Sequence, residues 1–201
     1  MSKLKIFTFP DTVLKQKALP IDRIDKSLYK VADDMLETMY DAPGVGLAAN
    51  QVGILQRILV LDTDYSHEEP LADMGPEDEN SKFSHAGEAG TPAVILNKNP
   101  KIIINPEIIR QEGSITWCEG CLSVPDYQAE VKRAAKITLQ YQDMDGLTTT
   151  LDAEGLQAVC IQHEIDHLNG KLFIERLSPL KKEMIQKKLA KERAERDRDD
   201  G

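Results

Sequence analysis

The chain has 201 residues, of which 41% are hydrophobic and 29% charged, the size and composition of one soluble globular domain with its own core. No apolar run approaches the roughly 18 residues that a membrane helix requires, and the first residues do not resemble a secretory signal. The net charge of −9 argues against binding to DNA or RNA through an overall electrostatic field, and nothing suggests a membrane partner.

Periodic apolar residues predict a helix near the start of the chain and buried strands after it. The helix is expected over residues 26–40, because apolar side chains recur there at helical spacing behind Asp25, a suitable N-cap, and a Pro-Gly pair follows. Residues 57–61 and 101–105 carry short runs of Ile, Leu and Val, which are typical of buried strands.

The stretch from Asp64 to Thr91 is expected to form a long surface insertion between these two strands. It contains eight acidic residues and one lysine, so it carries −7 of the net charge of −9 and leaves the rest of the chain close to neutral. Because it is rich in Gly, Pro, Ser and Asp and has no apolar pattern of its own, we expect a mobile loop.

The second half of the chain predicts a hairpin followed by a helix. Two strands, at 131–141 and 147–152, are separated by an Asp-Gly pair that is typical of a tight turn. A helix is then expected from about residue 153 to 168, and Gly170 is a natural residue for ending it.

The charged tail, residues 179–201, has helical propensity and is expected to fray near Arg196. Together the elements predict an α+β fold, with mostly antiparallel strands around one central helix and further helices near both ends. The sequence shows no internal repeat, so residues 1–201 are expected to form a single domain, with 64–91 as its acidic insertion.

The run from His163 to His167, which reads His-Glu-Ile-Asp-His, lies on the predicted central helix. Residues i and i+4 share a helix face, so both imidazoles can bind one ion, and Glu164 can act as general base toward a metal-bound water. This H-E-x-x-H arrangement is typical of zinc hydrolases. The alternative is a solvated helix face, but the chain has only four histidines, and their pairing around a glutamate favours a metal hydrolase.

A catalytic metal needs a third protein ligand and an open position for water. The candidates are the three cysteines and the two remaining histidines: Cys118, Cys121, Cys160, His67 and His85. The two histidines belong to the acidic insertion and are expected to be solvated. Cys160 continues an apolar stripe with Leu156 and Val159 and is expected in the core, because free cysteine is commonly buried.

Cys118 and Cys121 form a CxxC pair that allows two other interpretations. A redox dithiol would require a βαβ pattern that is absent around the pair. A structural Cys2His2 zinc site with the helix histidines would span 41 residues, against the ~12–15 of zinc fingers, and would leave Glu164 without a role. Three cysteines fit a reducing cytoplasm, but spacing alone does not choose between one cysteine ligand and two.

Three segments, in this order, resemble the motifs of the peptide deformylase family: 44–51, 119–123 and 162–167. The similarity covers nearly the whole chain except the acidic insertion and the extreme C-terminus. Residues 44–49 also match GxGxxA, but a helix precedes them where a dinucleotide-binding site requires a strand, so that interpretation fails.

The resemblance implies that Cys121, His163 and His167 hold one divalent metal, with water in the fourth position, and that Cys118 is not a ligand. One thiolate and two imidazoles suit Fe²⁺, Zn²⁺, Co²⁺ or Ni²⁺. Family members commonly work with Fe²⁺, which is the expected native metal, while Zn²⁺, Ni²⁺ or Co²⁺ can substitute.

The implied reaction is removal of the formyl group from formyl-methionine at the N-terminus of newly synthesised polypeptides. Metal-activated hydroxide attacks the formyl carbon, and Glu164 serves as general base and then as general acid. By resemblance, the Gln51 amide and the Leu122 N–H stabilise the oxyanion. Arg133 resembles a family position that pairs with Glu119 and supports the scaffold.

The resemblance also implies how the peptide binds. Backbone groups of Val45, Gly46 and Gly120 would pair with an extended substrate, as in strand addition. The methionine side chain would enter an apolar pocket near Leu47, lined by Leu156, Val159 and Cys160.

Partners and rival functions complete the expectations. The family suggests a cytoplasmic enzyme, and in some bacterial members the C-terminal helix docks on the ribosome. Here basic residues alternate with glutamates in that segment, which weakens the expectation. The rivals are a non-enzymatic domain held by a Cys2His2 zinc and a general metallopeptidase, whose H-E-x-x-H would normally recruit a third ligand downstream.

Overall fold

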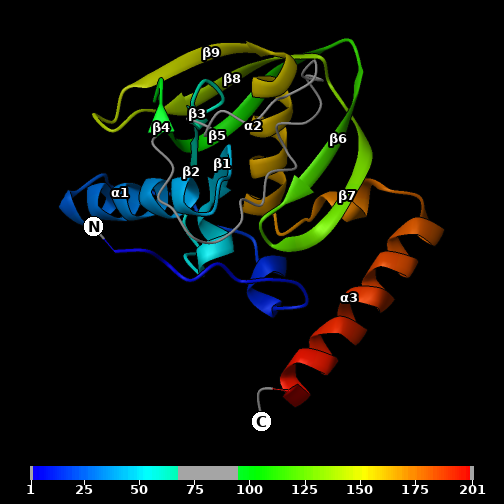
Figure 1. Cartoon of the computed structure of the whole chain (residues 1–201). Helices are drawn as coiled ribbons and strands as arrows, with labels where there is room; N and C mark the ends of the chain where they lie inside the picture. Colours follow the sequence, from blue (N-terminus) through cyan, green and yellow to red (C-terminus); the bar gives the residue numbers. More distant parts are fainter. Residues whose placement is uncertain (1, 68–94, 200–201) are drawn as a thin grey trace.

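The computed structural model describes residues 2–67 and 95–199 and has the predicted α+β architecture (Figure 1). Most of the expected acidic insertion, including His85, therefore lies outside the described residues. A five-stranded antiparallel sheet has the order β1-β2-β5-β8-β9. Its strands are β1 (Gly46–Ala48), β2 (Ile58–Leu61), β5 (Lys101–Glu112), β8 (Lys136–Gln142) and β9 (Thr148–Glu154).

The sheet packs between two helices, α1 (Lys26–Asp41) and α2 (Gly155–Leu168). In β2, Leu59 and Leu61 join the apolar cluster that contains α2, while Ile58 and Val60 join the cluster that contains α1. Successive side chains of a strand point to opposite faces, so both faces of β2 are buried. This explains why its sequence is apolar without alternation.

The second sheet is a hairpin of β6 (Ile115–Cys121) and β7 (Val124–Arg133), which lies beside α2 (Figure 1). Its apolar residues form a third cluster with the one-turn helices η1 (Thr12–Lys15) and η4 (Phe173–Arg176). A two-residue ladder joins β3 (Ser66–His67) to β4 (Ile95–Leu96). A further one-turn helix, η2 (Ala49–Val52), follows β1 directly.

Two of the predicted elements had wrong boundaries. The strand expected over 131–141 is divided, because β7 ends at Arg133 and β8 begins at Lys136. The central helix starts at Gly155 and not near residue 153, since β9 continues to Glu154. The predicted hairpin itself is confirmed as β8 and β9, whose turn is closed by the Asp143 carboxylate accepting from two backbone N–H groups.

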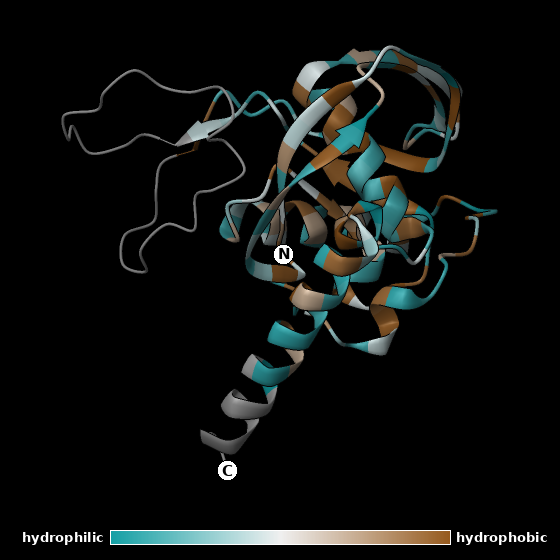
Figure 2. Ribbon diagram, turned by 90° about the vertical axis from the view of Figure 1, so that its right-hand side faces the viewer, coloured by the Kyte–Doolittle hydropathy of each residue, from teal (hydrophilic) through white to brown (hydrophobic). Residues whose placement is uncertain are grey.

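The C-terminal helix α3 (Pro179–Asp199) extends away from the rest of the fold and is largely hydrophilic (Figures 1 and 2). It continues past the expected fray at Arg196, because no Pro or Gly interrupts its Lys-, Glu-, Arg- and Ala-rich sequence. Its described apolar contacts with the core are made by buried Leu189 and half-buried Ile185, and further along the helix Arg193 lies 3.2 Å from the Asp11 carboxylate. No helix in the described part of the chain is both long and apolar enough to cross a membrane.

Candidate metal centre

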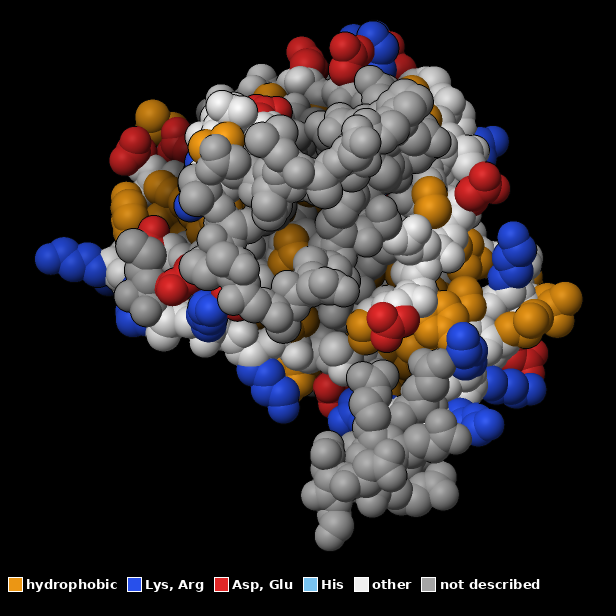
Figure 3. All heavy atoms as spheres, in the orientation of Figure 1, with side chains coloured by type: hydrophobic (Ala, Val, Ile, Leu, Met, Phe, Trp, Pro, Cys, Tyr) orange, Lys and Arg blue, Asp and Glu red, His pale blue; other side chains and the backbone are white. Residues whose placement is uncertain are grey.

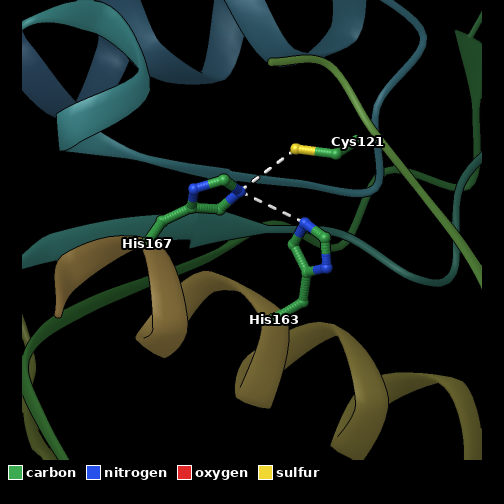
Figure 4. A group of neighbouring side chains, drawn as sticks. All are labelled: Cys121, His163 and His167. Carbon is green, nitrogen blue, oxygen red and sulfur yellow. Dashed lines mark hydrogen bonds between the residues drawn. The ribbon is translucent and has the colours of Figure 1, made fainter. Parts of the chain in front are cut away.

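Two elements bring three metal-binding side chains together. His163 and His167 lie one turn apart on α2, and Cys121 ends β6 above them (Figure 4). The Cys121 Sγ is 3.2 Å from the His167 Nε2, which is 3.2 Å from the His163 Nε2. Cys121, His163 and His167 form a group that could hold a metal ion, and their ligand atoms all lie within 4.8 Å of one another.

The spacing of these atoms fits one tetrahedral metal. Bonds of ordinary zinc length would place two nitrogens about 3.3 Å apart, and a sulfur and a nitrogen about 3.6 Å apart. Without a cation, the Cys121 sulfur and the Nε2 atoms of His163 and His167 would place three lone pairs close together, with few hydrogen-bond donors between them. The donor set of one thiolate and two imidazoles therefore suits a divalent transition metal.

Cys118 does not join this group. Its Sγ lies 3.6 Å from the Gln128 Oε1 on the neighbouring strand β7, and it is absent from the cluster of possible ligands. The structure thus brings one cysteine of the CxxC pair to the histidines, which disfavours the Cys2His2 interpretation. Cys160 is fully buried, and its thiol donates to the Val45 carbonyl oxygen at 3.5 Å.

A buried carboxylate orients the first histidine. The His163 Nδ1 donates to the Glu119 Oε2 at 2.8 Å, which leaves Nε2 facing the other two ligands. Glu119 in turn accepts from the Arg133 Nε at 2.6 Å and from its Nη2 at 2.8 Å. Burial opposes ionisation of Glu119, but the hydrogen bonds from Arg133 and His163 prevail and lower its pKa to about 2. Such a partner fixes the tautomer of a ligand histidine.

Because the pKa of Glu119 is lowered, the stability of the folded protein should depend on pH in the acid range. With a folded-state pKa of about 2 against an ordinary value of 4.5, Glu119 contributes stability that is complete above about pH 4.5 and is lost as the pH falls toward 2. We expect Glu119→Gln to lower the free energy of unfolding of metal-stripped protein by on the order of 3 kcal/mol at pH 7. Urea unfolding should show this difference shrinking below pH 4.5, and a constant difference down to pH 3.5 would contradict it.

Glu164, which follows the first ligand, is buried against β1. Its pKa is raised to about 7, chiefly by burial, which suits a group that exchanges protons near neutral pH. A bound cation would oppose this rise. Its Oε2 is buried and has no hydrogen-bond partner among the described residues. The carboxylate is packed so closely that a Cβ at Gly46 would lie 2.6 Å from its Oε1.

Gln51 points its amide toward the ligands from η2. Its Oε1 accepts from the Ala48 N–H at 2.8 Å, so its Nε2 is free to donate on the other side, 3.3 Å from the Ser123 Oγ and 3.8 Å from the Cys121 Sγ. Leu122 follows Cys121, and its side chain packs toward Gly44. The Gln51 amide therefore lies beside the ligands, and Leu122 directly follows the ligand Cys121 in the sequence. Ser123, which steadies Gln51, was missed from the sequence although it lies within the second motif.

The predicted peptide-binding residues lie on or next to three different elements, β1, β6 and α2. Val45 and Gly46 lie at β1, the outer strand of the large sheet, and the buried Gly120 lies on β6, which pairs only with β7 among the described strands. Each of these strands therefore has an edge without a partner strand. Of the predicted pocket residues, Cys160 contacts β1, Val159 is fully buried and Leu156 is half-buried at the start of α2.

Comparison with known proteins gives consistent matches over most of the chain. A family model described as polypeptide deformylase matches residues 3–183. The chain is 46% identical over 193 residues to the peptide deformylase of Mesorhizobium japonicum, covering 94% of both chains. It is 45% identical over 187 residues to that of Agrobacterium fabrum, covering 92% of this chain and 94% of the other.

Solved structures match the fold as well. A crystal structure of a peptide deformylase from Legionella pneumophila has a TM-score of 0.76 and 38% identity, covering 98% of this chain and 99% of the other. The peptide deformylase from Ehrlichia chaffeensis in complex with actinonin has a TM-score of 0.75 and 37% identity, covering 96% and 98%.

Proposed function

The chain belongs to the polypeptide deformylase family, and from that premise we propose how its residues perform the family's reaction, hydrolytic removal of the formyl group from new polypeptides. The observation that carries the proposal is the convergence of Cys121, His163 and His167 beside a buried Glu164. We take residues 1–201 as one deformylase domain that acts in the cytoplasm.

The family depends on a metal, and Cys121, His163 and His167 would hold it. When bound, the metal polarises the formyl oxygen and lowers the pKa of water near it. We propose Fe²⁺ as the native ion, with Zn²⁺, Ni²⁺ or Co²⁺ as substitutes, because a mixed thiolate and imidazole set accepts all four. Glu119, which accepts from the His163 Nδ1, would keep the Nε2 of that ring available to the ion.

Glu164 is the proposed general base and acid. Its burial holds its pKa near 7 in the metal-free protein, and its unpaired Oε2 is available to take the proton of the attacking water. The same carboxyl then delivers the proton to the departing amine of methionine. The Gln51 amide and the Leu122 N–H would stabilise the negative charge that develops on the formyl oxygen, since both lie beside Cys121.

We propose that the peptide binds as an added strand. Val45 and Gly46 at the outer strand β1, with Gly120 on β6, offer backbone groups to an extended substrate. The methionine side chain would enter beside α2, against Leu156, Val159 and Cys160. The contact between Cys160 and the Val45 carbonyl supports this placement, because it puts the helix wall directly beside the strand that would hold the peptide.

Gly46 is expected to tolerate no side chain. A Cβ there would lie 2.6 Å from the Glu164 Oε1 and 2.7 Å from the Cys160 Sγ, so the base must move. Because a displacement of about 1 Å costs on the order of 10²-fold, we expect Gly46→Ala to lower kcat about 10²-fold with the metal retained. Gly44→Ala is the matched control, since its Cβ would clash with the movable end of the Leu122 side chain, at 2.8 Å, and make an ordinary 3.5 Å contact with the Gly46 backbone oxygen. Equal activity of the two variants would contradict this expectation.

We expect the C-terminal helix α3 to contribute to stability through its first half, which packs on the core, and its last residues to contribute little. Apolar and basic side chains occur together near α3 (Figure 3), and Ile185 and Leu189 pack on the core. Deletion after Leu180 should therefore lower the free energy of unfolding by roughly 2 kcal/mol, the contribution of one buried leucine, and lower Tm with it. It should spare kcat on a short formyl-peptide at low temperature. Deletion after Lys191 should spare both. Loss of kcat in the protein that ends at Leu180 would contradict the proposal that the tail serves only packing and a weak ribosome contact.

The function is tested by measuring formate release from formyl-Met-Ala-Ser by protein loaded anaerobically with Fe²⁺. We expect formate and free Met-Ala-Ser in equal amounts, and no cleavage of unformylated Met-Ala-Ser. Cleavage of the peptide bonds without formate would instead indicate a general metallopeptidase. Metal content without either reaction would favour a structural metal site.

A further inference from the structure

A chain of ion pairs runs from the surface to a metal ligand across the back of α2. Arg176 on η4 donates to the Asp166 carboxylate through Nε at 2.5 Å and Nη2 at 2.7 Å. The Arg133 Nη1 donates to the same carboxylate at 2.6 Å, and its Nε and Nη2 reach Glu119. Glu119 then receives the His163 Nδ1–H at 2.8 Å.

The four ionised side chains of this ion-pair series alternate in sign, two arginines with two carboxylates, so their charges balance only when all four are present. The Arg133 and Glu119 side chains are fully buried and that of Asp166 is 8% exposed, whereas the Arg176 side chain is 43% exposed. Asp166 supplies one negative charge to two guanidinium groups. Its Oδ1 has Arg176 as its described partner, while its Oδ2 is shared by both arginines.

Removing Arg176 would therefore leave a buried carboxylate oxygen without a partner. A carboxylate in that state turns toward water or another donor, because an unsatisfied buried acceptor is costly. That rotation would weaken the hold of Asp166 on the Arg133 Nη1. The Arg133 Nη1 would then keep only its longer contact, 3.3 Å to the Gln162 carbonyl oxygen. The guanidinium would pivot against Glu119, which orients the ring of His163.

We propose that Arg176 is a positioning residue for the metal centre, which it reaches through Asp166, Arg133 and Glu119. In the described contacts, Arg176 pairs with Asp166 and reaches neither the ligands nor the residues of the proposed substrate site. Its effect is to hold the imidazole of His163 in the orientation that binds metal. This inference rests on the proposed metal centre and adds to it a residue from the opposite side of α2.

The exposed end of the ion-pair series, at Arg176, is accessible to small solutes. Arg176, Asp166 and Arg133 line a cavity of about 730 Å³ on the side of α2 that faces away from the ligands, together with Lys132 and Lys171. Free guanidinium can enter such a cavity and take the place of a missing arginine head group. Chemical rescue therefore gives a test that a general loss of packing would not satisfy.

The test compares cobalt-loaded Arg176→Ala, Arg176→Lys and Lys171→Ala proteins. Lys171 lines the same cavity, and its side chain has no described hydrogen bond or ion pair with the Asp166 carboxylate. Its backbone N–H donates to the Asp166 carbonyl oxygen at 2.9 Å, a bond that alanine keeps, so Lys171→Ala is the matched control. The readouts are Co²⁺ affinity, from competition with a chelator, and the visible absorption of the bound Co²⁺, which reports ligand geometry. We expect Arg176→Ala to bind Co²⁺ about 10- to 100-fold more weakly with an altered spectrum, because loss of a group that supports a ligand typically has that effect.

Arg176→Lys should fall between Arg176→Ala and the parent protein, and Lys171→Ala should match the parent. Millimolar guanidinium should restore the affinity and the spectrum of Arg176→Ala while leaving the parent unchanged. Parent-like affinity and spectrum in Arg176→Ala, with only a lower Tm, would overturn the proposal and make Arg176 a structural clamp. Absence of rescue by guanidinium would also overturn it.

A different result would show that the metal centre itself is misplaced. If Cys121→Ala binds Co²⁺ as tightly as the parent protein, the three proposed ligands are wrong and the failure lies with the proposed function. Weak binding by Cys121→Ala together with parent-like binding by Arg176→Ala removes only the positioning role.

Discussion

Replacing Glu164 by glutamine is expected to lower kcat for formate release by about 10²- to 10⁴-fold while one metal ion per chain stays bound. Glutamine keeps the size and one acceptor oxygen of the side chain but cannot take a proton. The three proposed ligands remain intact, because none of them uses Glu164 as a hydrogen-bond partner in the described contacts. KM for the formyl-peptide should change little, since the proton transfer occurs after binding.

The matched control is Glu154→Gln, the same chemical change at the exposed residue that precedes α2, where the side chain is 71% exposed. It should leave kcat within about twofold of the parent, because surface substitutions of this kind have small effects. If Glu164→Gln keeps its metal but no longer releases formate, the result supports Glu164 as the general base. Retained turnover would assign the proton transfer to another group and leave Glu164 as a packing residue beneath Gly46.

The parts of the site that lie close together in the sequence were predictable from it. His163, Glu164 and His167 share one helix, and helical geometry alone places the two imidazoles on one face. Cys121 required the family resemblance, because the spacing of the CxxC pair does not choose between one cysteine ligand and two. A register shift between Glu119 and Cys121 also interrupts the regular pairing of the hairpin that carries it. Alternation along a regular strand does not predict the direction of a side chain across a bulge.

The parts that depend on distant segments were not predictable. The link from Asp166 to Arg176 exists because η4 folds back on α2, and no periodicity signals that contact. The strand β1 was missed for another reason, since Gly46 and Ala48 have low strand propensity and the segment is only three residues long. Its conformation is imposed by pairing with β2 and by burial against Glu164.

Replacing Cys121 by alanine is expected to remove the bound metal and to reduce formate release to background. A site with two remaining imidazoles lacks the anionic ligand, and the affinity of such sites depends on the number and charge of their ligands. Metal content after gel filtration, measured by atomic emission, should fall from about one ion per chain to near zero. The fold should survive, because Cys121 is half-buried and the β6 backbone ladder does not depend on its thiol.

Cys118→Ala is the control that gives this result its meaning. It removes an identical thiol three residues away on the same strand, one that faces Gln128 and not the histidines. We expect full metal content and parent-like kcat, so that the two cysteines of one CxxC pair behave oppositely. Loss of metal in both variants would instead support a four-ligand structural site. Such a site has no open position for water, so Glu164 would have no water to deprotonate and hydrolysis by this centre would be excluded.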